Sequence, residues 1–132
     1  MIPFRLIPQP GVPIYEQAVY AATRAIITGQ LRVGDPFPSV RTLSRELKIN
    51  PNTAHKVITQ LLNDGLIESH PGIGTVIAKR PGSSSSERAA LLNRRVEELV
   101  VEAKRLSIGR QQLIAAIDMQ WLKLSDPHEA LR

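Results

Sequence analysis

Two short amphipathic segments follow each other closely in residues 40–64. The first begins after Ser39, whose hydroxyl suits a helix N-cap, and its apolar residues repeat at helical spacing: Val40, Leu43 and Leu47. The second begins at Asn50-Pro51, a capping side chain followed by a proline at the first helical position. Lys48-Ile49 leaves room only for a short turn between them. The spacing therefore predicts a helix-turn-helix, with helices of about 40–47 and 51–64.

The flanking residues predict the rest of a compact domain. An apolar helical face runs from Ile14 and stops at Gly29, and residues 34–38 are too rich in Gly and Pro to be helical. Gly65 suits the left-handed end of the helix that begins at Asn50-Pro51. Two short strands, 66–69 and 75–78, then form a hairpin through residues 70–74. A hairpin directly after a helix-turn-helix predicts a winged helix-turn-helix.

A second segment follows a stretch rich in Pro, Gly and Ser. We expect a winged domain over 1–80, a linker over 81–86 and a helical segment over 87–132, with Ser84 and Glu87 as a possible capping box. Helices of about 87–106 and 110–124 carry apolar residues at helical spacing: Leu92, Val96, Leu99, Ala103, Leu106, Leu113, Ile117 and Trp121. The fold class is mainly α with a small β-hairpin: a winged helix-turn-helix followed by a two-helix C-terminal segment.

The apolar faces of the C-terminal segment need a partner, because two amphipathic helices cannot bury both faces by themselves. A homodimer through these residues is the simplest solution. The alternative is an intramolecular bundle face.

Charge and composition narrow the class of partner. The chain has 17 Lys+Arg against 12 Asp+Glu, a net charge of +5, and residues 1–80 hold +4 of it. The basic balance favours a polyanion such as nucleic acid. No cysteine is present, and His55, His70 and His128 have no metal-ligand spacing, so we expect no metal, no cofactor and no catalysis. Without a membrane-spanning run, we expect a soluble cytoplasmic protein.

Several polar side chains are placed where a helix-turn-helix meets DNA. At the start of the second helix of the motif, Asn52, Thr53, His55 and Lys56 can reach base edges in a major groove. Arg41 and Arg45 lie one turn apart on the helix before it and suit phosphate or guanine. Ser39 and Thr53 are possible phosphate donors, and Gly72 and His70 lie in the wing.

Each of these residues also has a plainer interpretation. Ser39 can serve only as a cap, and Gly72 only as a turn residue. His55 and Lys56 can be merely solvated. His70, with no acidic partner expected in the adjacent sequence, is as readily a hydrated loop residue as a DNA contact.

Taken together, residues 13–78 closely resemble the GntR family of bacterial regulators. The motifs that carry the resemblance are Pro13-Ile14-Tyr15-Glu16-Gln17, Gly34-Asp35, Pro38-Ser39-Val40-Arg41-Thr42-Leu43, Asn50-Pro51-Asn52-Thr53, Asp64-Gly65-Leu66-Ile67 and Gly72-Ile73-Gly74-Thr75. The resemblance implies DNA contacts at Arg41, Asn52, Thr53, His55, Lys56 and Gly72. The short tail is similar to that of the YtrA-type branch, in which two C-terminal helices mediate dimerisation. Ser44, Ala54 and Ile58 depart from the commoner residues of the family.

The sequence therefore predicts a DNA-binding transcription regulator, a repressor that binds a palindromic operator as a homodimer. The alternative is a winged-helix protein-interaction module without sequence-specific DNA binding. A regulatory fragment of a larger enzyme is a third interpretation. A small-molecule effector, if there is one, has room only in a modest pocket between the domains or across the dimer.

Overall fold

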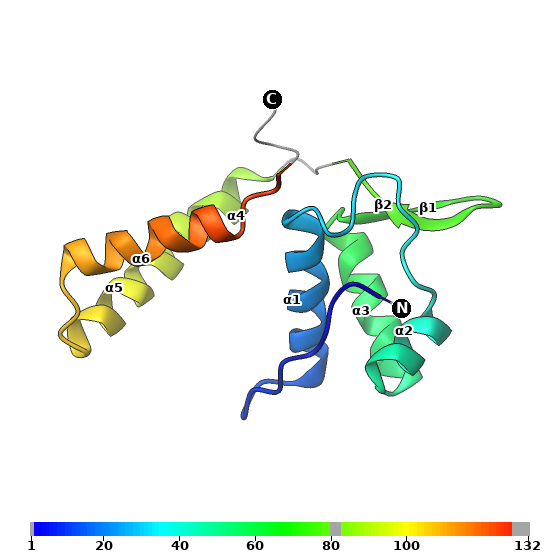
Figure 1. The fold of residues 1–132 in the computed structure, drawn as a ribbon, viewed down its shortest axis with the longest axis horizontal. Helices are drawn as coiled ribbons and strands as arrows, with labels where there is room; N and C mark the ends of the chain where they lie inside the picture. Colours follow the sequence, from blue (N-terminus) through cyan, green and yellow to red (C-terminus); the bar gives the residue numbers. More distant parts are fainter. Residues whose placement is uncertain (1, 80–82, 128–132) are drawn as a thin grey trace. The chain divides into compact units, whose positions relative to one another are not determined.

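The computed structural model describes residues 2–79 and 83–127, so His128 and the outer ends of the expected domains lie outside the described residues. The chain divides into two compact units, Met1–Pro81 with Asp126–Arg132, and Gly82–Ser125. The first contains three helices and a hairpin, and the second consists of helices (Figure 1). The expected fold class, a winged helix-turn-helix followed by a helical segment, is confirmed.

Three helices of the first unit end within a residue or so of the predicted positions. They are α1 (Ile14–Ile27), α2 (Val40–Leu47) and α3 (Pro51–Asn63). The Ser39 hydroxyl accepts a 3.1 Å hydrogen bond from the backbone N–H of Thr42, and the Asn50 side chain accepts one of 2.7 Å from that of Asn52. Both predicted N-caps are present. They fix where α2 and α3 begin, because each satisfies a backbone donor that the helix itself cannot pair.

The turn between α2 and α3 is held by two local features. Lys48 takes a left-handed conformation, with φ 55°, and its N–H bonds to the carbonyl of Ser44. The Ser44 hydroxyl donates a 2.6 Å hydrogen bond to the carbonyl of Ile49. Ser44 therefore ties the end of α2 to Ile49, the residue before the cap of α3.

The wing is an antiparallel pair of strands, β1 (Ile67–His70) and β2 (Gly74–Ile77). Both strands are displaced by one residue from the prediction. Leu66 does not start β1 because its N–H closes the turn that ends α3, with a 3.0 Å hydrogen bond to the carbonyl of Leu61, although its own carbonyl accepts from the N–H of Ala78 at 3.1 Å. The breaker-rich segment before α2 adds an edge to β2, through Phe37 N–H to the Thr75 carbonyl at 2.8 Å.

The core of the first unit lies between its three helices and the base of the wing. α1 and α2 each pack against α3, and β1 against the end of α3 (Figure 1). Phe4, from the segment before α1, stacks on Phe37 with ring centroids 6.2 Å apart. The buried cluster consists of Phe4, Ala18, Ala22, Ala25, Leu31, Phe37, Leu43, Ala54, Val57, Leu61, Leu66, Ile67 and Ile77.

The second unit begins with a helix that changes type along its length. Its parts are α4 (Ser85–Ala89), a π-helical segment η1 (Ala90–Arg95) and α5 (Val96–Arg105). The predicted capping box is present, with Ser84 and Glu87 each accepting from the other's backbone N–H. Because Ser84 is the cap, the helix begins at Ser85, two residues before the predicted start. The π-helical segment was not predicted, and it shifts the face on which Leu92 lies relative to Val96.

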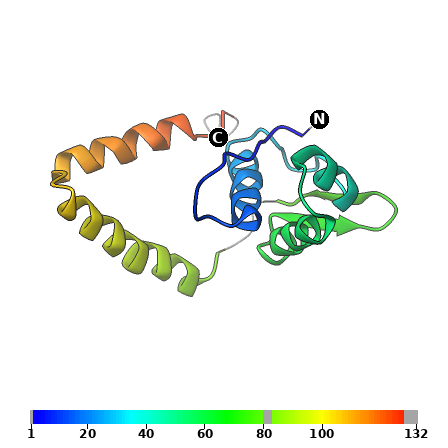
Figure 2. The same ribbon diagram turned by 90° about the horizontal axis from the view of Figure 1, so that it is seen from below.

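The last helix, α6 (Arg110–Lys123), follows a short turn in which Ser107 has a positive φ. From this turn α5 and α6 diverge (Figure 2). Ala103 is buried beside the turn, where its carbonyl accepts from the N–H of Ile108 at 2.9 Å. The larger apolar side chains of α5 and α6, by contrast, are mostly exposed.

Candidate nucleic-acid interface

The first turn of α3 presents polar side chains on an otherwise buried helix. Ala54, Val57 and Leu61 are fully buried, whereas Asn52, His55 and Lys56 are exposed and Thr53 is half-buried. The Asn50 cap orients the backbone here, and the helix N-terminus adds a positive potential. The predicted residues of α3 therefore share one solvent-facing surface, which is polar and carries one positive charge.

The helix that precedes this surface carries two exposed arginines. Arg41 and Arg45 are both exposed and lie one turn apart on the helix that packs against α3. Ser39, at the same end of α2, uses its hydroxyl locally: it accepts from Thr42 N–H and donates to the Thr42 hydroxyl, each at 3.1 Å. The structure thus supports its capping role directly, whereas Arg41 and Arg45 keep their charged groups in solvent.

The tip of the wing is a Pro-Gly turn. Ile73 N–H bonds to the His70 carbonyl at 3.0 Å, and Gly72 has φ 78°, as the third position of a type II turn requires. A Cβ on Gly72 would meet no atom within 4 Å, so the backbone conformation and not crowding demands glycine. Ile73 is 74% exposed at this tip, an apolar side chain to which no sequence pattern gave a role.

His70 has an acidic partner, contrary to expectation. Its Nε2 lies 2.9 Å from Oε1 of Glu68, and both side chains are about half exposed. The two residues are separated by one along β1, and alternate side chains of a strand point to the same face. The sequence did not predict this partner because Glu68 is not adjacent to His70 along the chain. Glu68 places a negative charge on the wing, next to a side chain predicted to meet DNA.

α1 contributes Tyr15, which contacts two side chains of α3. The Tyr15 hydroxyl donates a 2.9 Å hydrogen bond to Oε1 of Gln60, and the Lys56 ammonium lies 5.8 Å from the centroid of the Tyr15 ring. Tyr15 thus connects α1 to the exposed side of α3. The motif Pro13-Ile14-Tyr15 carries the resemblance to the family but does not predict this contact, because the contact spans 45 residues.

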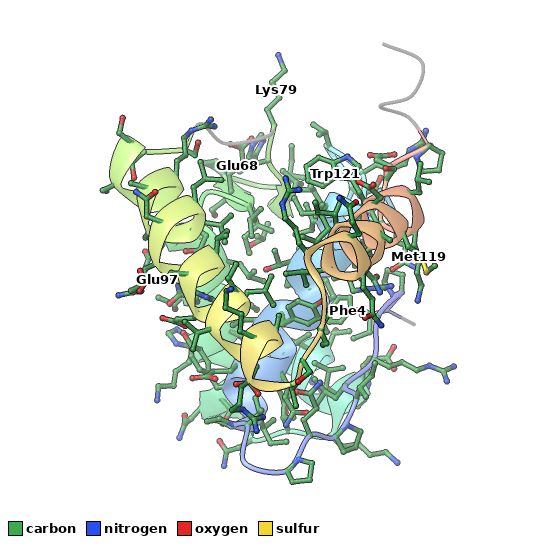
Figure 3. The ribbon with its side chains drawn as sticks, turned by 90° about the vertical axis from the view of Figure 1, so that its left-hand side faces the viewer. Phe4, Glu68, Lys79, Glu97, Met119 and Trp121 are labelled. Atoms are coloured by element: carbon green, nitrogen blue, oxygen red, sulfur yellow. The ribbon has the colours of Figure 1, made fainter. Side chains whose placement is uncertain are left out.

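The apolar residues predicted for dimerisation are largely solvent-exposed. Leu92, Val96, Leu99, Leu106, Ile117 and Trp121 are exposed, Leu113 is half-buried, and Ala103 is covered by the turn between α5 and α6. Met119 and Trp121 project from different sides of α6 (Figure 3), so this helix is apolar around much of its circumference. The exposed apolar side chains of the second unit that the prediction did not include are Leu91, Val100, Val101, Ile114, Met119 and Leu122.

Residues 2–79 and 83–127 offer neither a metal centre nor a membrane span. No group of three or more His, Asp or Glu side chains in these ranges is arranged to hold a metal ion. None of the helices in the described part of the chain is both long and apolar enough to cross a bilayer.

Known proteins match this chain along most of its length. A repressor of Bacillus subtilis named YtrA is 28% identical over 117 residues, which cover 88% of this chain and 86% of YtrA. A structure described as a transcriptional antiterminator from Listeria monocytogenes EGD-e has the same fold, with a TM-score of 0.81, 24% identity, and coverage of 93% and 92% of the two chains. The DNA-binding domain of AraR, solved with its operator ORX1, superposes with a TM-score of 0.50 at 26% identity, covering 55% and 93%.

The family assignment rests on the winged helix-turn-helix. The model of the bacterial regulatory proteins of the gntR family matches residues 14–77, from the start of α1 to the end of β2. Within this range lie the caps, the turn and the polar surface of α3 described above. Residues 14–77 of this chain therefore form a helix-turn-helix domain of the GntR family of bacterial regulatory proteins.

Proposed function

We propose that this regulator of the GntR family represses transcription in the cytoplasm by binding a palindromic operator as a homodimer. The observation that carries the proposal is the exposed polar surface of α3, formed by Asn52, Thr53, His55 and Lys56 on a helix whose opposite side is fully buried. The likeness to the AraR domain solved with its operator supports the same use of the helix-turn-helix. YtrA of Bacillus subtilis is named as a repressor, which supports repression here.

Base recognition and phosphate binding are assigned to different residues. Asn52 and His55 carry donors and acceptors suited to base edges at the entry of α3 into a major groove. Arg41, Arg45 and Lys56 carry full charges, which suit phosphates. Because Gly72 has no side chain and no other atom lies near its Cα, the wing backbone can come close to the sugar-phosphate rim at this residue. Repression then follows from occlusion of the promoter.

The homodimer is proposed from the second unit. A helix with apolar residues around much of its circumference is normally buried, yet α6 exposes Ile117, Met119 and Trp121. Along α5, Val96 and Leu99 are also exposed. A second copy offers the same surfaces and would bury both helices in a symmetric interface. Two copies would then place their α3 helices in successive major grooves, about 34 Å apart.

The test is the salt dependence of DNA binding. Arg41→Ala and Lys56→Ala should each weaken binding to a duplex selected from a random pool, and each should lower the slope of log K against log salt by about 0.9. Glu97→Gln, a change in the second unit, serves as the control with an unaltered α3 surface. An unchanged slope in both variants, or weak binding that is blind to sequence in the wild type, would contradict the proposal. The latter result would indicate a protein-interaction module.

A further inference from the structure

The contact between Tyr15 and Lys56 joins α1 to the exposed surface of α3. Tyr15 lies in the first turn of α1, half-buried against the hydrophobic core. Lys56 lies on the exposed surface of α3, four residues after Asn52 and therefore on the same side of the helix, one turn further from its N-terminus. The 5.8 Å separation between the Lys56 ammonium and the ring centroid is within the range of a cation–π interaction.

The tyrosine is itself held in place, so it can hold the lysine. Its hydroxyl bonds to Gln60, one turn after Lys56, and Nε2 of Gln60 donates to Oδ1 of Asp64 at 2.8 Å. Tyr15 thus spans one turn of α3 with its ring at Lys56 and its hydroxyl at Gln60. Because the ring is packed against the core and hydrogen-bonded at its far end, its position is fixed before any partner binds.

We propose that Tyr15 is a positioning residue for DNA binding: its ring holds the Lys56 ammonium at the α1 edge of α3, where the ammonium meets a phosphate and not a base. The inference rests on the proposed function, because it assigns a role within the same DNA-binding surface. A free lysine side chain loses up to about 2 kcal/mol of rotamer entropy when it is fixed. Because the Tyr15 ring already restrains the ammonium in the folded protein, part of this entropy is lost on folding. The Lys56 side chain therefore loses less rotamer entropy when DNA binds.

A phosphate contact and a base contact have different signatures. Losing a phosphate contact weakens specific and non-specific binding by the same factor and flattens the salt dependence. Losing a base contact weakens binding only to the preferred sequence. The placement of Lys56 one turn beyond Asn52 and toward α1 predicts the first signature for Lys56 and, through it, for Tyr15.

The test is a double-mutant cycle with Tyr15→Leu and Lys56→Ala, measured on a duplex selected by the wild type from a random pool and on a random-sequence duplex of the same length. Lys56→Ala should weaken both complexes by one factor and lower the salt slope by about 0.9. In the presence of Lys56, Tyr15→Leu should weaken binding to both duplexes by about threefold. In the Lys56→Ala background, the same substitution should leave both affinities unchanged. Tyr15→Phe keeps the ring and should keep the wild-type salt slope.

The matched control is Tyr20→Leu, the same substitution on the same helix at a side chain that is 65% exposed. It should leave both affinities unchanged. Equal losses from Tyr15→Leu with and without Lys56 would overturn the positioning role and leave Tyr15 as a structural residue. A loss confined to the selected duplex in Lys56→Ala would overturn the phosphate assignment. If neither Lys56→Ala nor Arg41→Ala weakened binding, the proposed function itself would fail.

A measurement on the unbound wild type keeps the inference testable if Tyr15→Leu does not fold. The ring should shift the Lys56 side-chain methylene proton resonances upfield relative to those of Lys48, and Tyr15→Phe should retain the shift. Lys56 resonances at the values of a solvated lysine in the wild type would overturn the inference.

Discussion

The hydroxyl of Ser44 donates a 2.6 Å hydrogen bond to the backbone carbonyl of Ile49, across the turn that separates α2 from α3. Together with the 3.1 Å hydrogen bond from the Ile49 N–H to the Ser44 carbonyl, this bond ties Ile49, the residue before the cap of α3, to the last turn of α2. The geometry of the proposed DNA surface therefore depends on a half-buried side chain that does not itself face solvent.

Ser44→Ala should lower the free energy of unfolding by about 1 kcal/mol, since a part-buried carbonyl loses its donor. Urea denaturation measures the change. Thr23→Ala is the control, because the Thr23 hydroxyl bonds to Val19 within the same helix and connects no second element. Equal effects of the two substitutions would show that the turn bond has no special role.

Lys48→Gly should raise the free energy of unfolding by about 1 kcal/mol. Lys48 ends α2 with φ 55°, and this left-handed conformation destabilises any residue with a Cβ relative to glycine by about that amount. Lys48→Ala keeps the backbone strain while it removes the long side chain and its charge, so it should bring no gain. Thermal unfolding of the two variants separates the contributions. A stabilisation by Ala as large as that by Gly would contradict the assignment.

Glu68→Gln should strengthen binding to duplex DNA by about twofold to fivefold, because it removes a negative charge beside His70 on the wing. The gain should shrink as salt is raised. Glu97→Gln changes the net charge by the same amount in the second unit and is the matched control. The same gain in both variants would mean that net charge alone matters and that the wing does not approach DNA.

Leu99→Asp should convert the protein from a dimer to a monomer, because the proposed interface would have to bury the new carboxylate. Light scattering after size-exclusion chromatography gives the mass. Ile7→Asp is the control, the same kind of change at an exposed apolar residue of the first unit. Trp121→Ala should weaken the dimer less, by truncation alone. A Leu99→Asp protein that remains dimeric would place the interface elsewhere.

The elements of the winged domain were predictable because their ends are set by neighbouring residues. Ser39 and Asn50 cap the helices they precede, and the prolines and glycines around them allow few other structures. The polar side of α3 was also predictable, because the periodicity of a helix is enough to separate it from the buried side that holds Ala54 and Val57.

Contacts between distant segments were not predictable from such local rules. Phe4 stacks on Phe37 across 33 residues of sequence, and the segment before α2 pairs with β2 as a further edge. Tyr15 meets α3 in the same way. The π-helical segment at Ala90–Arg95 was missed because an apolar repeat of three and four residues is satisfied equally well by a regular helix.

The central claim is that α3 reads operator DNA as one of a symmetric pair. Selection of bound duplexes from a random pool by the wild-type protein tests it most directly, followed by the same selection with Asn52→Ala. The wild type should enrich a two-fold symmetric sequence whose half-sites lie about one helical turn apart, and Asn52→Ala should relax the preference at one position of each half-site. Enrichment of no sequence, or of one without symmetry, would contradict the account.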